Sequence, residues 1–117
     1  MPRIRDKKDI DWERITKALP CEKNQAQRAQ RKKMWKEGFD PNGNGYASLA
    51  ECEKGIRDCI KSDDLFDAKP AIMRSFAFAK AASPGDETDS KYLEWVEFRL
   101  FLQTLRQYFE DWQVWQL

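Results

Sequence analysis

Residues 40–51, D-P-N-G-N-G-Y-A-S-L-A-E, place oxygen-bearing side chains at regular intervals around two glycines. The first and last residues of this stretch are acidic, and the third, fifth and ninth carry amide or hydroxyl oxygens. Hard divalent cations such as Ca²⁺ bind about six to eight oxygens of these kinds. The stretch therefore predicts a loop that surrounds a cation.

The spacing of these donors matches the twelve-residue calcium loop of the EF-hand. At position 6, Gly45 permits the sharp turn with a positive φ. At position 12, Glu51 is long enough to bind an ion through both carboxylate oxygens, whereas Ser48 at position 9 is expected to act through water. We therefore predict Ca²⁺ as the cofactor, held by Asp40, Asn42, Asn44, the backbone carbonyl of Tyr46, Ser48 and Glu51.

The loop contains only two carboxylates, so we expect a dissociation constant on the order of 10⁻⁶ to 10⁻⁴ M. Ala47 at position 8 is small where a larger apolar residue usually pairs with a partner loop, which also favours weak binding. The alternative is a relict loop, or an Asn-Gly-rich connector, that binds nothing.

Helical periodicity surrounds the loop, which predicts an all-α fold. We expect this fold to be one EF-hand pair in a single lobe, with an extra N-terminal helix and an extended C-terminal helix. Residues 1–10 are expected to be a flexible basic arm, and residues 11–117 a single domain. The expected helices are 11–19, closed by Pro20; 25–39, capped by Asn24; 49–61; 68–83; and one from Tyr92 onward.

A second, degenerate hand is expected at about residues 68–109, after the first hand at about 25–61. Its loop would pair with the first through Leu93 and Ala47, each at position 8. Lys91 stands at position 6, where glycine is needed, so the second hand is predicted mainly as a structural partner. A weaker second calcium site would use Asp86, Thr88, Ser90, Glu94 and Glu97.

Composition argues against an enzyme and against a membrane-spanning chain. The sequence has no histidine, the commonest general base, and no catalytic constellation. It contains no apolar run of about 18 residues, and its first residues do not resemble a secretory signal. An intracellular, cytoplasmic location is therefore expected, with the three cysteines reduced.

Charge is unevenly distributed along the chain. Residues 1–37 hold twelve Lys or Arg against six Asp or Glu, whereas residues 38–117 hold nine against fourteen. A basic helix face could bind an anionic membrane or another acidic surface, although a solvated charged face is the simpler interpretation. Nucleic acid is not expected, because no recognition motif accompanies the basic residues. The residues of this face are Arg28, Arg31, Lys32, Lys33 and Lys36.

The chain resembles the flagellar calcium-binding proteins of trypanosomatids, also called calflagins. The resemblance runs from Asp11 to about Asp111 and is carried by D-W-E-R-I-T-K-A-L-P at 11–20, F-A-F-A-K-A at 76–81, V-E-F-R-L-F-L at 96–102 and Y-F-E at 108–110. It implies four EF-hands in typical members, of which this chain matches the first pair, and a location at the flagellar membrane. Pro2 stands where acylated members have glycine, so attachment through a myristoyl chain is not expected.

Two functions from different classes follow. The first is a calcium sensor or modulator that acts through a protein partner or a membrane surface. The second is a calcium-independent interaction or scaffold module of a cytoskeletal or flagellar assembly. The apolar segment 108–117 favours self-association, because a single lobe has little surface left to cover it.

Overall fold

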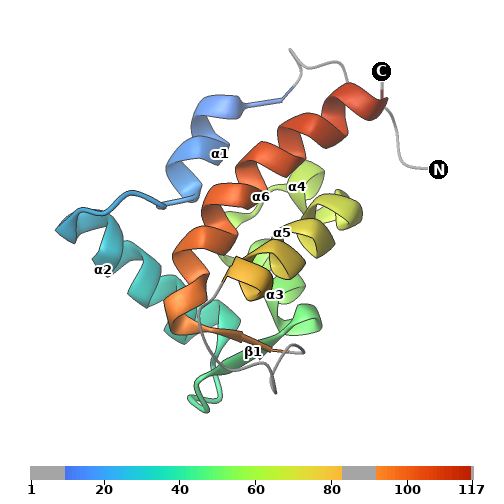
Figure 1. Ribbon diagram of the computed structural model, residues 1–117. Coiled ribbons are helices and arrows are strands. Elements are labelled where there is room, and N and C mark those ends of the chain that lie inside the picture. The colour runs from blue at the N-terminus through green and yellow to red at the C-terminus, as the bar shows by residue number, and fades with distance from the viewer. Residues whose placement is uncertain (1–9, 83–91, 117) are drawn as a thin grey trace.

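The computed structural model describes residues 10–82 and 92–116. In Figure 1, helices account for most of this part of the chain, and the two strands are short. The all-α prediction is confirmed. The elements are α1 (Trp12–Ala18), α2 (Gln25–Met34), the π-helical turn η2 (Trp35–Phe39), β1 (Tyr46–Ser48), α3 (Leu49–Gly55), the π-helical turn η3 (Ile56–Ile60), α4 (Asp63–Asp67), α5 (Lys69–Ala82), β2 (Tyr92–Glu94) and α6 (Trp95–Gln116).

The two strands join the two hands. β1 lies in the first hand and β2 in the second, and they pair antiparallel with Ala47 opposite Leu93, as the sequence predicted. Both residues are fully buried. The rings of Tyr46 and Tyr92 meet on the outer face, with their centroids 6.0 Å apart. The strand pair therefore fixes the register of one loop against the other.

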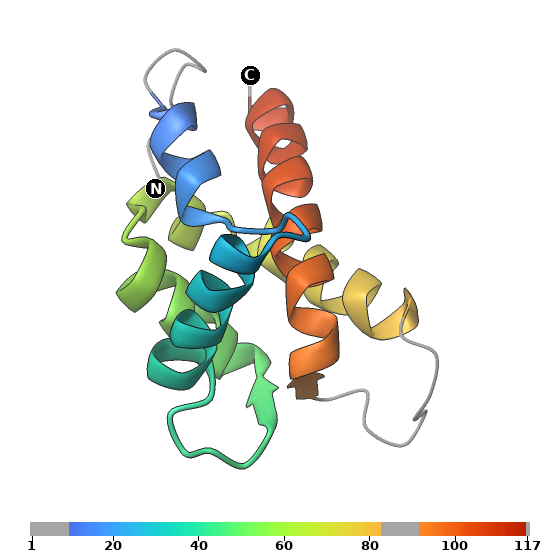
Figure 2. The ribbon, with the colours of Figure 1, turned by 90° about the vertical axis from the view of Figure 1, so that its left-hand side faces the viewer.

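An aromatic core connects the helices of both hands. Phe39, at the end of η2, packs edge-on against Phe98 of α6, with ring centroids 4.7 Å apart. Trp35 contacts the same Phe98 ring at 5.1 Å. Phe101 and Phe109 continue this buried stripe along α6. Figure 2 shows the long helix α6 extending from β2 to the C-terminal end of the described chain, and α5 is its main packing partner.

Side-chain caps explain where several helices begin. The Asn24 side chain accepts a hydrogen bond from Gln27 N at 2.8 Å and starts α2. Ser62 Oγ accepts from Leu65 N at 3.2 Å and starts α4. Such caps satisfy amide groups that have no partner within the helix. Helix α4 was not predicted, since its residues lie between the expected helices 49–61 and 68–83.

The helices on either side of the first loop end in π turns that pack tightly together. Asp40 N donates to Trp35 O at 2.6 Å, and Lys61 N donates to Ile56 O at 3.1 Å. A Cβ atom on Gly55 would lie 2.6 Å from the Phe39 ring, and one on Gly38 would collide with Cys59 Sγ. Glycine at these two positions therefore permits the close approach.

Helix α1 lies against the C-terminal half of α6. The Trp12 ring packs on Phe109, with centroids 5.3 Å apart, and Arg14 donates to the carbonyl oxygens of Ile60 and Lys61 at 3.1 and 2.8 Å. Ile10, which we had assigned to the flexible arm, is only 5% exposed and belongs to the core. The rest of that arm, residues 1–9, lies outside the described residues.

In the described ranges, no helix combines the length and the apolar character needed to cross a bilayer. Cys52 is fully buried, and Cys21 and Cys59 are partly buried. All three thiols are free, as expected.

Candidate metal centre

The first loop begins where η2 ends, and its first residue is already buried. Asp40 is 5% exposed. Its Oδ1 atom accepts a hydrogen bond from Asn44 N at 3.2 Å, and Oδ2 accepts from Gly45 N at 2.8 Å. The backbone of the loop therefore folds around the Asp40 carboxylate at position 1.

Two glycines give the loop its sharp turns. Gly43 has a φ of +70° and Gly45 a φ of +88°, in the region that L side chains rarely adopt. The positive φ expected for Gly45 is confirmed. Between them, Asn44 Oδ1 accepts from Tyr46 N at 3.0 Å and leads the chain into β1.

The last position of the loop is tied to the start of α3. Ser48 Oγ accepts from Glu51 N at 3.2 Å, and Glu51 Oε1 accepts from Ser48 N at 3.0 Å. This reciprocal pair is a capping box. A carboxylate has several acceptor positions on two oxygens, so Glu51 retains capacity for a cation while it caps the helix.

The donor set fits calcium in chemical type. All candidate donors are oxygens, and Ca²⁺ prefers oxygen ligands held in a flexible geometry. Within residues 10–82 and 92–116, no group of three or more His, Cys, Asp or Glu side chains gathers as a metal cluster. The first loop would instead combine two carboxylates, Asp40 and Glu51, with neutral oxygens. Its full ligand set stays a prediction.

The second hand differs in the partner of its closing glutamate. Asp86, Thr88 and Ser90 lie outside the described residues. Glu94 is partly buried, and Glu97 is 3% exposed. Glu97 Oε1 forms an ion pair with Lys80 Nζ at 3.1 Å and also accepts from Glu94 N at 2.8 Å.

Sequence reasoning missed Lys80 in this role. A signal was present, because Lys80 precedes Glu97 by seventeen residues, and the residue at the same distance from Glu51 is the apolar Met34. A lysine within residues 76–82, which are otherwise apolar, indicates either exposure or a buried partner.

The structure corrects one member of the predicted basic face. Arg31 is 6% exposed and donates to Pro20 O at 2.9 Å and Glu22 O at 2.7 Å. Burial, and then the nearby Arg99, lower the pKa of its guanidinium. Arg31 therefore anchors the α1–α2 connection and is not available to a surface partner. The remaining members, Arg28, Lys32, Lys33 and Lys36, are exposed.

Comparison with known protein families gives a match over most of the chain. The model of the FCaBP EF-hand domain matches residues 15–105. The chain belongs to the FCaBP EF-hand domain family. The match includes the first loop, the β1–β2 pair and the first half of α6. The resemblance to the flagellar calcium-binding proteins is thereby confirmed.

Curated proteins similar to this FCaBP-type chain come from trypanosomes. A flagellar calcium-binding protein of Trypanosoma cruzi is 32% identical over 103 residues, which is 85% of this chain and 48% of that protein. Flagellar calcium-binding protein TB-44A of Trypanosoma brucei brucei is 33% identical over 105 residues, 86% of this chain and 25% of its own length. Flagellar calcium-binding protein TB-17 of the same organism is 32% identical over 105 residues, which is 86% of this chain and 44% of that protein.

The chain therefore spans about half, or less, of the length of these curated relatives. No solved structure matches it.

Proposed function

We propose that this chain is a calcium-binding EF-hand protein that acts as a sensor or modulator. One ion binds in the first loop, and the second hand serves as its structural partner. The names of the relatives, all described as calcium-binding, support the choice of ion. Nothing in the proposed role requires catalysis.

The observation that carries this proposal is the shape of the first loop. Asp40 holds the amides of positions 5 and 6, Gly45 adopts the left-handed turn, and Glu51 stands in the first turn of α3. The loop is thus already folded around its first carboxylate and closed by its last, which reduces the ordering that ion binding must impose.

Calorimetric titration of the metal-free protein with Ca²⁺ and Mg²⁺ tests the proposal. We expect one Ca²⁺ per chain, with a dissociation constant on the order of 10⁻⁶ to 10⁻⁴ M. Glu51→Gln should abolish the heat of binding, because the neutral amide cannot replace the closing carboxylate. Glu53→Gln is the matched control, since Glu53 lies in α3 outside the loop and forms a partly exposed pair with Lys69 at 3.7 Å.

Two bound equivalents, or unchanged binding in Glu51→Gln, would show that the site is wrongly assigned. No binding by the wild type would favour the second function, a calcium-independent interaction module. A change in tryptophan fluorescence that is absent from a Trp35→Phe variant would indicate that the ion alters the core, because Trp35 contacts both Trp95 and Phe98.

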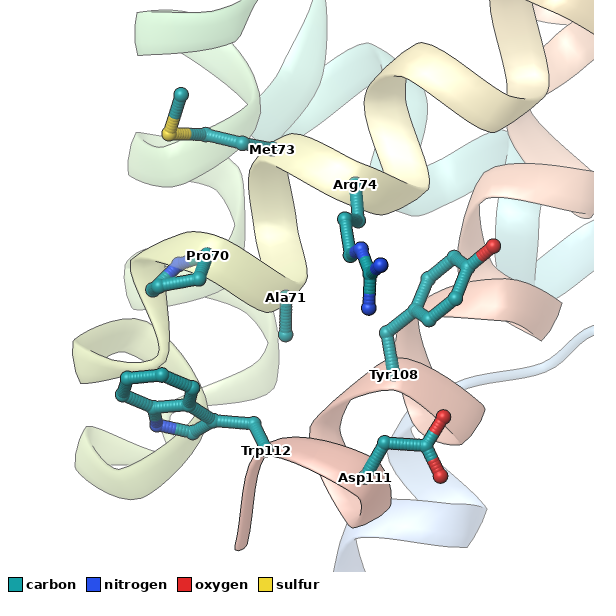
Figure 3. Close-up of a pocket in the computed structure, with 7 residues that line it drawn as sticks. All are labelled: Pro70, Ala71, Met73, Arg74, Tyr108, Asp111 and Trp112. Carbon is teal, nitrogen blue, oxygen red and sulfur yellow. The ribbon is translucent and has the colours of Figure 1, made fainter. Parts of the chain in front are cut away.

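An apolar groove supports self-association as the form of partner binding. The groove lies between the start of α5 and the end of α6, with a volume of about 440 Å³. In Figure 3, Trp112 lies beside Pro70 on one side, and Tyr108 lies near Arg74 on the other. Asp111 borders the same groove. For a two-fold dimer across this groove, we expect Arg74 of one chain to face Asp111 of the other.

Sedimentation equilibrium tests the self-association, with Trp112→Ala as the variant that shortens the apolar wall. We expect the wild type to dimerise as concentration rises and the variant to dimerise less. A wild type that stays monomeric at the highest concentration would contradict the proposed dimer. Arg74→Glu should weaken the dimer, and adding Asp111→Arg should restore it.

The flagellar names of the relatives favour a flagellar or cytoskeleton-associated location for this chain. Four exposed basic residues of α2 and η2, Arg28, Lys32, Lys33 and Lys36, favour contact with an anionic membrane surface. Co-sedimentation with phosphatidylserine vesicles, compared with neutral phosphatidylcholine vesicles, tests this contact. Equal binding to both would contradict it.

A further inference from the structure

In the second hand, the closing carboxylate of Glu97 pairs with the ammonium group of Lys80. Lys80 Nζ lies 3.1 Å from Glu97 Oε1, and the two side chains are 9% and 2% exposed. Lys80 belongs to α5, the helix that enters the second hand, and Glu97 to the first turn of α6, the helix that leaves it. The pair therefore joins the two helices of this hand inside the lobe.

Glu97 occupies the place that Glu51 has in the first hand. The strand register pairs Ala47 with Leu93, and each glutamate follows its paired residue by four positions. Each also accepts the amide three residues before it, from Ser48 N at 3.0 Å and from Glu94 N at 2.8 Å. The two carboxylates thus have equivalent backbone surroundings.

The difference between the hands lies on their entering helices. Met34, seventeen residues before Glu51, is buried and apolar, so it offers Glu51 no charge. Lys80, seventeen residues before Glu97, supplies a full positive charge. A buried carboxylate requires such compensation, because the charged form is poorly solvated away from water.

We propose that the Lys80 ammonium takes the part of the metal ion in the second hand. It neutralises the closing carboxylate, and it holds α6 against α5 whether or not calcium is present. The inference concerns the second hand alone and does not depend on whether the first loop binds calcium. The second hand is then a fixed support for β1 and the first loop.

Lys80→Met gives the second hand the residue that the first hand carries. The variant is made in a Glu51→Gln background, so that the first loop contributes no calcium response. In EGTA, we expect the double variant to melt about 10 °C or more below Glu51→Gln, because Glu97 is left buried without a cation. Millimolar CaCl₂ should then raise the Tm of the double variant and leave that of Glu51→Gln unchanged.

Matched controls separate this role from that of an ordinary ion pair. Lys69→Met removes a lysine from the same helix, and its pair with Glu53 is partly exposed, so its Tm should stay close to that of the parent. Lys80→Arg, which retains a cation, should keep most of the stability and show no calcium response.

An unchanged Tm in Lys80→Met would overturn the proposal, and so would a lowered Tm that calcium does not raise. Should the double variant be unfolded in EGTA, its circular dichroism with added CaCl₂ decides the matter: folding on addition supports the proposal, and a chain that stays unfolded contradicts it. Titration of the wild type reports on the first loop separately.

Discussion

Single glycines determine how closely the helices of the first hand approach each other. Gly55 lies in α3 with no side chain, and the Phe39 ring fills the space that a Cβ atom would take. Phe39 is itself fully buried and in contact with Phe98, so the ring has little freedom to withdraw. Helix propensity alone would favour alanine at this position by about 1 kcal/mol. Packing therefore predicts that Gly55→Ala destabilises the protein, whereas helix propensity predicts that it stabilises the protein.

We expect Gly55→Ala to lower the free energy of unfolding by about 1–3 kcal/mol, the usual cost of overpacking a well-filled core. Urea denaturation followed by Trp fluorescence measures the change. Lys54→Ala, at an exposed neighbouring position, should alter stability by about 0.5 kcal/mol or less. A more stable Gly55→Ala variant would show that the Phe39 ring can move aside.

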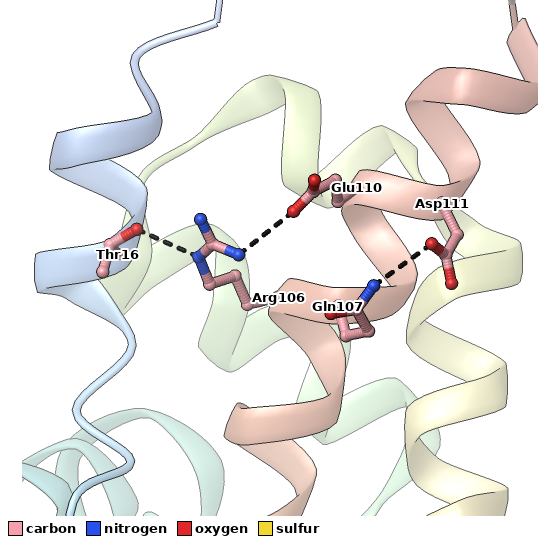
Figure 4. A network of polar contacts seen from close by, with 5 residues as sticks. All are labelled: Thr16, Arg106, Gln107, Glu110 and Asp111. Atoms are coloured by element: carbon pink, nitrogen blue, oxygen red, sulfur yellow. Dashed lines mark hydrogen bonds and ion pairs between the residues drawn. The ribbon is translucent and has the colours of Figure 1, made fainter.

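At the scale of elements, α1 is held to the lobe by contacts on η3, through Arg14, and on α6. Figure 4 shows Arg106 between the two helices: its Nε atom donates to Thr16 Oγ1 at 3.1 Å, and its Nη1 atom lies 3.2 Å from Glu110 Oε2. The guanidinium also lies over the Trp12 ring, 5.8 Å from the centroid. Arg106 is therefore the main polar attachment of α1 to α6.

Arg106→Met should loosen α1 without unfolding the core. We expect faster amide hydrogen exchange in residues 12–18 and a loss of about 0.5–1.5 kcal/mol in stability. Exchange measured by mass spectrometry tests this. Gln107→Met is the control, because the hydrogen bond of Gln107 in the described part of the chain stays within α6, to Asp111 Oδ1 at 3.2 Å, and exchange in α1 should stay as in the wild type. Unchanged exchange in Arg106→Met would mean that the other contacts of α1, made by Trp12, Arg14 and Ile15, are enough to hold the helix.

Much of the fold could be predicted from local signals in the sequence. The loop spacing fixed the positions of Ala47 and Leu93, and the Asn24 cap fixed the start of α2, so both were predicted correctly. The burial of Arg31 and the Lys80–Glu97 pair depend on residues distant in the chain, and no periodicity reports such contacts.

The π turns were missed for a related reason. Helical periodicity distinguishes buried from exposed faces, but one extra residue in a turn changes that pattern only locally. What fixes the turns is the contact of Gly38 with Cys59 and of Gly55 with Phe39, which becomes visible only when the two helices are placed side by side.

At the scale of the whole molecule, the two hands share one core and should unfold together. Phe39 of the first hand packs on Phe98 and Phe101 of the second, and the strand pair links the loops. Cooperative unfolding is expected of such a small, jointly packed unit. The buried thiol of Cys52, 0% exposed, is a natural reporter of this process.

Cys52 should react with iodoacetamide only when the lobe unfolds. Burial, and then the neighbouring carboxylates Glu51 and Glu53, raise the pKa of its thiol, so the reactive thiolate is scarce at neutral pH and becomes more abundant only at strongly alkaline pH. We expect the labelling of Cys52, followed by peptide mass spectrometry across a urea series, to coincide with the loss of helical circular dichroism. Labelling of Cys52 in native buffer as fast as that of the partly buried Cys21 would contradict a single cooperative lobe.

The π turn η2 also determines how far α2 is rotated about its own axis relative to the calcium loop. A π turn contains one residue more than an α turn, and each residue of an α-helix advances about 100° around the axis. Deletion of one codon, that of the exposed Lys36, would convert the turn to α and rotate α2 by about that angle relative to Asp40. Arg31 would then turn away from Pro20, although every residue of the ion loop would be unchanged. The orientation of the whole helix α2 thus depends on the one extra residue in the π turn.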